Sequence, residues 1–264
     1  MDFVNTSLPD IIELKGVNQL YPGEKIKTIE DFSLLIEDAP DVGQFIILLG
    51  ASGCGKSTIL RYISGLQQPT SGEILIKGKP ITPVDRVSMV FQQYSSFPWL
   101  TVLENVALGL EYKGVPFKKR TEQAMEMIEI VGLKGHEKKF AKHPILSGGQ
   151  LQRVAIARSL LSNQDILLLD EPFGALDINT RLKMQDFLMD IWMKVSPTII
   201  LVTHDISEAV YLGNDIYIMA AKPGRITNHV KVDLPFPRTK KIKRSPEFIS
   251  MVNQIEDLMI QVQQ

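Results

Sequence analysis

Residues 50–58, GASGCGKST, combine glycines, hydroxyls and a lysine at a spacing that can bind phosphate. They match the P-loop pattern G-x-x-x-x-G-K-[ST] and stand between an apolar run and a stretch with helical periodicity, as that motif requires. The glycines let backbone N–H groups converge on an anion, and the helix N-terminus adds about half a positive charge. The positions expected to contact nucleotide phosphates are Gly50, Ala51, Ser52, Gly53, Cys54, Gly55, Lys56, Ser57 and Thr58.

Two side chains of this loop have separate expected roles. Lys56 supplies a positive charge for the β- and γ-phosphates, and the Ser57 hydroxyl is placed to ligate Mg²⁺. We therefore expect ATP and Mg²⁺ as cofactors. The alternative, a glycine-rich turn without a ligand, is disfavoured by the flanking strand and helix. Cys54 is interpreted as a small loop residue rather than a redox switch.

Two carboxylates follow the apolar run 166–169. In a parallel α/β sheet ligands bind beyond the carboxyl ends of the strands, so both acids should face the P-loop. Asp170 is expected to hold Mg²⁺, directly or through water, and Glu171 to orient or deprotonate the attacking water. Acids also end strands as helix caps, so the pair indicates catalysis only in combination with the P-loop.

Residues 146–150, LSGGQ, predict a second anion-binding loop. Ser147 can cap a helix with Gln150 as its capping-box partner. Gly148 and Gly149 would leave backbone N–H groups uncovered at the positive end of the helix dipole. An ordinary capped helix is the alternative, but a glycine pair weakens the first turn unless something approaches closely.

The elements that must position these residues follow an α/β pattern. Short apolar runs predict buried strands of a largely parallel sheet, at 45–49, 87–91, 166–169 and 198–203. Helices are expected over 56–66, from the capping box Thr101–Glu104 onward, and around the apolar stripes of 124–131 and 184–191. The segment from about 95 to 162 should be a helical insert. The sequence thus predicts an α/β fold with a P-loop NTPase core.

Composition limits the class of partner. The 264 residues carry 29 Lys and Arg against 30 Asp and Glu, a net charge of −1, which argues against wholesale binding of a nucleic-acid backbone. No apolar run approaches the ~20 residues of a membrane span. The single cysteine cannot form an internal disulfide, which fits a reducing compartment. We expect a soluble protein, with any membrane crossing left to another chain.

The end of the chain is expected to form a separate segment. After about residue 235 the sequence becomes basic, and Ser245-Pro246 then predicts the start of a final helix. We therefore divide the chain into 1–235 and 236–264, with the final helix docking on its own domain. Its apolar face would comprise Phe248, Val252, Ile255, Met259 and Val262.

The run LSGGQLQRVAIARSLL (146–161) resembles the signature region of ABC (ATP-binding cassette) ATPases, and the other motifs of that family follow in order over roughly residues 10–235. By this resemblance Tyr21 stacks on adenine, with Phe32 or Tyr62 as stand-ins. Gln92, in VFQQ, resembles the Q-loop glutamine that touches Mg²⁺ and relays to a permease. Asp177, in ALD, resembles the D-loop.

His204, in VTHD, resembles the switch histidine that contacts the γ-phosphate. From its position alone it is also the residue before a helix cap formed by Asp205 and Glu208, which would be a structural role. Its place after a strand, downstream of the two carboxylates, favours the functional interpretation.

The resemblance further implies an antiparallel β subdomain and ATP hydrolysis between two subunits, identical or closely related. The P-loop of one would face Ser147, Gly149 and Gln150 of the other. The implied partners are an integral membrane permease and a solute-binding protein, and the implied location is the cytoplasmic face of the inner membrane.

Three segments resemble the ATPases of nitrate/sulfonate/taurine-type importers: FPWLTVLENV (97–106), KPGRI (222–226) and LPFPR (234–238). Phe97, Pro98 and Trp99 either contact the permease or pack under the insert. The transported solute and the permease itself are not indicated.

Two other functions are compatible with the motifs. A soluble ABC ATPase that acts on nucleic acid would draw on the basic cluster, although a solvated surface explains such a cluster as well. The cluster also lacks interleaved aromatic residues. It consists of Arg238, Lys240, Lys241, Lys243 and Arg244. The other alternative is a nucleotide-binding scaffold without turnover.

Overall fold

The computed structural model describes residues 10–37, 43–82, 86–93, 95–162 and 165–263. The chain divides into two compact units. The first comprises residues 1–87 and 202–264, and the second comprises residues 88–201. Each unit is described by itself.

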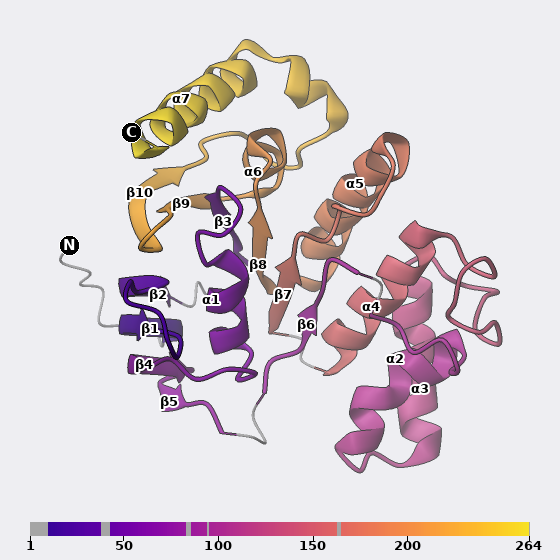
Figure 1. Ribbon diagram of the computed structural model, residues 1–264. Helices are drawn as coiled ribbons and strands as arrows, with labels where there is room; N and C mark the ends of the chain where they lie inside the picture. The colour runs from indigo at the N-terminus through magenta and orange to yellow at the C-terminus, as the bar shows by residue number, and fades with distance from the viewer. Residues whose placement is uncertain (1–9, 38–42, 83–85, 94, 163–164, 264) are drawn as a thin grey trace. The chain divides into compact units, whose positions relative to one another are not determined.

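The first unit contains a four-stranded antiparallel sheet in the order β2-β1-β4-β5 (Figure 1). Its strands are β1 (Asp10–Gln19), β2 (Ile29–Glu37), β4 (Ser71–Ile76) and β5 (Lys79–Pro80). Burial along β2 alternates, with Phe32, Leu34 and Ile36 buried between more exposed neighbours, as expected for a sheet that covers a core with one face. This sheet is the antiparallel subdomain that the family resemblance implies.

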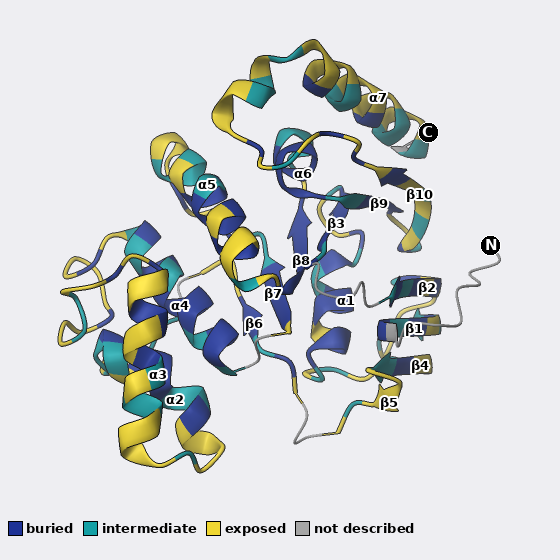
Figure 2. Cartoon of the chain, turned by 180° about the vertical axis from the view of Figure 1, so that it is seen from behind, coloured by how far each residue is buried: buried dark blue, intermediate teal, exposed yellow. Residues whose placement is uncertain are grey.

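A second group of strands in this unit has the order β10-β9-β3. β3 (Phe45–Gly50) runs parallel to β9 (Asp215–Ala220), and β10 (Arg225–Lys231) is antiparallel to β9. All six residues of β3 are buried, which explains its uninterrupted apolar sequence (Figure 2).

The helices of the first unit are α1 (Lys56–Ile63), α6 (Ile206–Leu212) and α7 (Pro246–Gln263). α1 is shorter than the predicted helix 56–66, because Gly65 adopts a left-handed conformation (φ 73°) and ends it. The predicted start of α7 is confirmed, since the Ser245 hydroxyl accepts a hydrogen bond from Phe248 N–H. On the predicted apolar face of α7, Phe248 and Ile255 are buried.

Arg238 is a structural side chain of the first unit. It is only 3% exposed, and its Nη1 donates to the carbonyl oxygens of Val210, Tyr211 and Gly213 at the end of α6, at 3.0, 3.2 and 2.7 Å. It therefore satisfies carbonyl groups that the helix end leaves unpaired. Burial lowers the pKa of Arg238 to about 10, so the guanidinium remains charged at neutral pH. The prediction that Arg238 belongs to a basic surface cluster is therefore wrong.

The second unit contains β6 (Met89–Val90), β7 (Ile166–Asp170) and most of β8 (Thr198–Thr203), along which the chain returns to the first unit. β6 runs parallel to β7, with Met89 opposite Leu168. The strand predicted over 87–91 is reduced to the two residues of β6. These strands confirm the predicted mixture of parallel strands and helices.

The helices of the second unit are α2 (Val102–Tyr112), α3 (Phe117–Ile130), α4 (Gly148–Ser162) and α5 (Ile178–Val195) (Figure 1). The predicted capping box at the start of α2 is confirmed, because Thr101 and Glu104 bond each other reciprocally. Gly109 permits close approach of α2 and α4, since a Cβ there would lie 1.7 Å from Ser162 Oγ. α4 is buried on most sides, as expected for the central helix of a small bundle.

Candidate nucleotide-binding site

The P-loop lies in the first unit and connects β3 to α1. α1 begins at Lys56, and its N-cap is Gly55, which adopts a left-handed conformation (φ 96°) and has no side chain to cover the first turn. Gly53 also has a positive φ of 80°, and among the described residues no atom lies within 4 Å of where its Cβ would be. The loop therefore presents backbone N–H groups and a helix N-terminus on an open side, which is an arrangement that binds anions.

Packing beneath the loop also requires glycine at positions 50 and 55. A Cβ at Gly50 would lie 2.8 Å from both Cys54 Sγ and Met219 O, and one at Gly55 would lie 2.2 Å from Ile29 Cδ1. Cys54 is fully buried beneath the loop, as befits a small structural residue. The two sheets of the first unit thus support the loop from below.

The Lys56 side chain is held at the loop by backbone carbonyl groups of the loop itself. Its side chain is only 4% exposed, and Nζ donates to Gly50 O at 2.8 Å and to Ala51 O at 3.0 Å. The ammonium is therefore already positioned beside the loop. Ser57 and Thr58 follow it in the first turn of α1, where Ser57 is half-buried and Thr58 is buried.

Of the aromatic residues expected to stack on a base, only Tyr21 is accessible. It is half-exposed just after β1, and its hydroxyl accepts a hydrogen bond of 3.2 Å from Gln67 Nε2. Phe32 and Tyr62 are fully buried. The Tyr62 hydroxyl donates to Gln19 inside the unit, and burial raises the pKa of Tyr62. Neither of these two can stack on a nucleotide without unfolding its surroundings.

His204 belongs to the first unit and is exposed. Its neighbours Thr203 and Asp205 are both held by hydrogen bonds. The predicted cap after it is confirmed: Asp205 Oδ1 accepts from Glu208 N at 2.9 Å. Thr203 Oγ1 donates to Glu208 Oε2 at 2.8 Å and accepts from Asp205 N at 3.0 Å. The backbone is thus rigid on both sides of an accessible imidazole.

The two carboxylates lie in the second unit, where β7 ends. Asp170 is the last residue of β7 and is half-buried. Glu171 adopts a left-handed conformation (φ 44°), and its carbonyl accepts from Gly174 N at 3.0 Å to close a turn. Such a conformation at a non-glycine residue costs roughly 1–3 kcal/mol and is typical of functional sites. Residue type gave no indication of it.

The Gln92 side chain lies beside the turn that begins at Glu171. A Cβ at Gly174 would lie 2.7 Å from Gln92 Nε2 and 3.4 Å from its Cγ, so the glutamine occupies the space that a side chain at 174 would need. Gly174 is a residue of this site that sequence reasoning missed. The only signal was a glycine three positions after Glu171.

The predicted capping box of residues 146–150, called the signature loop below, is confirmed. Ser147 N donates to Gln150 Oε1 at 2.9 Å, and Gln150 N donates to Ser147 Oγ at 3.3 Å. Ser147 is exposed and Gly148 is half-exposed, but Gly149 is buried, and its Cβ would lie 3.0 Å from Thr180 Cγ2. The expectation that both glycines lie open needs correction, because α5 covers the second. Gly149 is explained by packing, and its contact with phosphate remains a prediction.

Two further residues of this unit have defined local partners. Asp177 is the N-cap of α5 and accepts hydrogen bonds from Asn179 N at 3.0 Å and Thr180 N at 3.1 Å. Hydrogen bonds from Thr180, through its side chain and its backbone, are the main reason for the lowered pKa of Asp177. His136, which sequence reasoning also missed, places its Nε2 3.1 Å from Gln150 Nε2.

The segment 97–99 is partly packed and partly exposed, and its contact with a permease remains a prediction. Phe97 is half-buried with its ring 4.9 Å from the Arg158 guanidinium, and its backbone N–H and C=O both bond the Asn105 side chain. Trp99 is 67% exposed, and Pro98 is exposed as well. Phe97 therefore packs, whereas the next two residues form surface.

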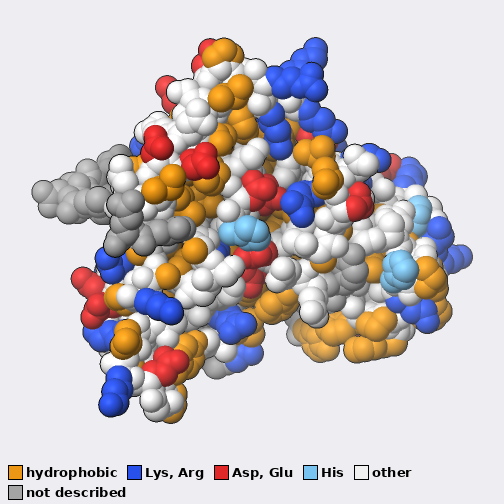
Figure 3. Space-filling model, turned by 45° about the horizontal axis from the view of Figure 1, so that its top comes forward, with side chains coloured by type: hydrophobic (Ala, Val, Ile, Leu, Met, Phe, Trp, Pro, Cys, Tyr) orange, Lys and Arg blue, Asp and Glu red, His pale blue; other side chains and the backbone are white. Residues whose placement is uncertain are grey.

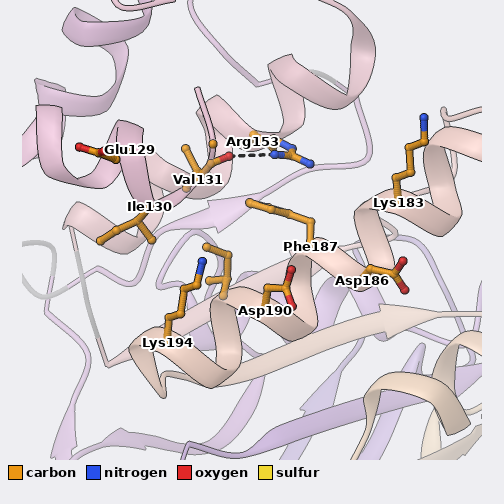
Figure 4. A pocket seen from close by; sticks show the side chains of 11 residues that line it. Glu129, Ile130, Val131, Arg153, Lys183, Asp186, Phe187, Asp190 and Lys194 are labelled. Atoms are coloured by element: carbon orange, nitrogen blue, oxygen red, sulfur yellow. Dashed lines mark hydrogen bonds between the residues drawn. The ribbon is translucent and has the colours of Figure 1, made fainter. Parts of the chain in front are cut away.

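A cavity of about 410 Å³ between α3, α4 and α5 does not contain any of the predicted site residues (Figure 4). Arg153 lies across it, donating from Nη1 to Val131 O at 3.0 Å and stacking over the Phe187 ring at 4.3 Å. Burial lowers the pKa of Arg153. The Arg153 side chain connects α4, the signature helix, to α5 and to the end of α3.

A phosphate loop at the start of α1, with an acid pair that ends an apolar strand, defines a P-loop nucleoside triphosphatase. A family model described as ABC transporter matches residues 40–174, and the chain belongs to this family. The nitrate import ATP-binding protein NrtD of Synechocystis is 41% identical over 257 residues, which cover 94% of each chain. The aliphatic sulfonates import ATP-binding protein SsuB of Bacillus subtilis is 46% identical over 238 residues, covering 90% of this chain and 89% of the relative.

Solved structures agree with this assignment. cbiO1 from Clostridium perfringens, a part of the ABC transporter complex cbiONQ, superposes with a TM-score of 0.75 at 25% identity, covering 95% of this chain and 99% of that chain. The ATP-binding cassette MJ0796, in a dimeric post-hydrolysis state bound to ADP and phosphate, gives 0.69 at 33% identity over 85% of this chain and 100% of its own. The chain is an ABC ATPase that binds and hydrolyses ATP. Across the part of the chain that the structure describes, every helix is too short or too polar to cross a bilayer.

Proposed function

We propose that this chain is the motor subunit of an importer for a small oxyanion of the nitrate or sulfonate class, and that a separate permease carries the solute. The observation that supports this most is similarity over nearly the whole chain to two relatives named for import of such anions. The segments 97–106, 222–226 and 234–238 point to the same group.

The P-loop and its neighbours bind the nucleotide in this proposal. Tyr21 stacks on adenine, backbone N–H groups of residues 50–58 surround the phosphates, and Lys56 neutralises the β- and γ-phosphates. Lys56 exchanges its present bonds to the Gly50 and Ala51 carbonyls for phosphate oxygens.

The donor set fits a magnesium ion. Ser57 offers a hydroxyl, Asp170 a carboxylate and Gln92 an amide oxygen, and oxygen ligands of this kind are those that Mg²⁺ prefers. When bound, Mg²⁺ neutralises charge on the phosphate oxygens. Glu171 orients the attacking water and accepts its proton, and His204 donates a hydrogen bond to the γ-phosphate. The turn 171–174 holds Glu171 rigidly for this task.

Two copies of the subunit complete the sites in this scheme. The capped first turn at Ser147, with Gly148, Gly149 and Gln150, contacts the nucleotide on the partner's P-loop, and Asp177 lies at the same junction. Two-fold symmetry then gives two equivalent sites from one sequence. ATP favours the closed pair because only that state completes the site, and hydrolysis releases it.

The closed pair transmits its movement to the permease through the stretch from Gln92 to Glu104. The exposed Trp99 and Pro98 supply the contact surface, and Phe97 supports them from below. The subunit is peripheral, on the cytoplasmic face of the inner membrane, and a solute-binding protein delivers the anion to the complex.

Nucleic acid is not among the proposed partners. Arg238 is buried, and the basic side chains that lie together in Figure 3 form only a small group at the upper right of the face drawn, while elsewhere acidic and basic side chains are mixed. A basic stripe of the kind that follows a phosphate backbone needs clustered charge. A gel shift with plain DNA or RNA at modest salt tests this point, and salt-sensitive binding would contradict it.

Affinity purification of the subunit from native membranes tests the main proposal. We expect a permease and a solute-binding protein to co-purify, and the reconstituted complex to hydrolyse ATP faster with nitrate or a sulfonate than with a sugar or an amino acid. A Glu171→Gln complex should assemble equally well but lack stimulated hydrolysis. Recovery of a permease whose ATPase responds only to an unrelated solute would refute the oxyanion assignment.

A further inference from the structure

His136 and Gln150 meet at the start of the signature helix. His136 is half-buried in the connection between α3 and α4, and its Nε2 lies 3.1 Å from Gln150 Nε2. The backbone of His136 is fixed on both sides, because its N–H donates to Leu133 O and its carbonyl accepts from Lys139 N. The ring is therefore held against the Gln150 side chain.

The orientation of the Gln150 amide follows from its other contact. The group 2.9 Å from the Gln150 terminal amide is the backbone N–H of Ser147, which can only donate. The amide oxygen must therefore face Ser147, and the amide NH₂ must face His136. With the amide inverted, the Gln150 NH₂ group would face the Ser147 N–H, so that two donors would lie opposite each other.

The same logic fixes the state of the imidazole. Because the Gln150 NH₂ group donates, His136 Nε2 must accept with its lone pair, and the ring hydrogen must be on Nδ1. His136 Nδ1 is buried, and no hydrogen-bond partner for it is found among the described residues. A buried N–H without a partner is unfavourable by roughly 1–3 kcal/mol. An apolar residue at position 136 would avoid this cost. The presence of a histidine therefore indicates that its contact with Gln150 has a role other than stabilising the fold.

We propose that His136 is a positioning residue for ATP hydrolysis. It holds the Gln150 amide so that Oε1 caps Ser147, which keeps the first turn of α4 in place before the partner's nucleotide arrives. The effect on catalysis rests on the proposed role of the signature loop at the partner's phosphate. The effect on the cap does not.

Two substitutions separate hydrogen bonding from filling of space. His136→Gln keeps an acceptor near the Nε2 position, whereas His136→Phe keeps a flat ring without one. His143→Phe is the matched control, since His143 is an exposed histidine of the same connection. Thermal unfolding of all three full-length chains shows whether each one folds.

Hydrogen exchange at Ser147 N–H in the nucleotide-free chain tests the positioning step directly. We expect exchange about fivefold faster in His136→Phe, as befits loss of one hydrogen bond, and near wild type in His136→Gln and His143→Phe. Equal exchange in wild type and a folded His136→Phe would overturn the proposal. If His136→Phe does not fold, the comparison rests on His136→Gln and His136→Asn, whose amide is too short to reach Gln150.

ATP-dependent pairing of chains that also carry Glu171→Gln tests the consequence for function. His136→Phe should weaken pairing about fivefold, His136→Gln should restore it, and His136→Phe should have no further effect once Gln150→Leu is present. An additive loss in that double variant would overturn the proposed route through Gln150. Faster exchange at Ser147 with unchanged pairing would leave the positioning role intact and contradict the proposed role of the signature loop.

Discussion

In the second unit the Gln92 side chain fills the space beside Gly174, where a Cβ would lie 2.7 Å from Gln92 Nε2. The two residues are far apart in the chain, and Gly174 closes the turn that begins at Glu171. The glutamine proposed to relay to the permease therefore rests on the turn that carries the proposed catalytic base.

Substitution of Gly174 by alanine should separate folding from catalysis. The nearest atom is the far end of a flexible side chain, so Gln92 can move aside and the free energy of unfolding should change by less than about 1 kcal/mol. Phosphate release should fall several-fold because Gln92 is displaced. Thermal unfolding and a phosphate-release assay measure the two effects.

The control for this substitution is its combination with Gln92→Ala. If Gly174→Ala acts by displacing Gln92, it should have little further effect once that side chain is removed. Fully additive losses would show that Gly174 acts by a different route.

Glu171→Gln should reduce phosphate release by roughly 10²–10⁴-fold, because an amide cannot accept the proton of the attacking water. The change is nearly isosteric, so the turn closed by Gly174 N–H should persist and stability should be unchanged. ATP should now accumulate in a stable pair of subunits, which sedimentation can detect. Equal phosphate release by wild type and variant would mean that Glu171 is not the base and would favour a scaffold without turnover.

The parts of the site that could be predicted from the sequence are those fixed by short-range interactions. The capping box of Ser147 and Gln150 spans one helical turn, so residue types alone define it. The P-loop is similar, because its glycines, its lysine and the flanking elements are contiguous.

The parts that could not be predicted depend on packing between distant segments. The sequence around Arg238 predicts a surface charge, whereas in the fold its guanidinium is buried and donates to carbonyl groups at the end of α6 and of the segment after β10. Gly149 reads as an open backbone position, and only α5 covers it. The left-handed conformation of Glu171 has no signal in residue type, because the surrounding turn imposes it.

Arg238→Leu should destabilise the protein by about 2–4 kcal/mol. The substitution leaves carbonyl groups of Val210, Tyr211 and Gly213 without their donor in a buried place. Chemical denaturation measures the change. Lys241→Ala, at a nearby exposed lysine, is the control and should alter stability by no more than about 0.5 kcal/mol. If Arg238→Leu lowered the free energy of unfolding as little as the control does, the hydrogen bonds of Arg238 would not contribute to stability.

The capping box at the start of α2 should make part of the stability depend on pH. Hydrogen bonds from the Thr101 backbone and side chain lower the pKa of Glu104. A carboxyl whose pKa is lower in the folded state stabilises the protein above its unfolded pKa, and this contribution disappears as pH falls through the folded pKa. Glu104→Ala should therefore cost about 0.5–1 kcal/mol at neutral pH.

The same substitution should have progressively less effect in acid, because the wild-type carboxyl then becomes protonated and loses its advantage. Urea unfolding of both chains across the acidic range measures the difference. Glu126→Ala is the matched control, since Glu126 is an exposed glutamate in the neighbouring helix α3. A difference between wild type and Glu104→Ala that stayed constant into acid would show that the carboxylate charge does not contribute to the cap.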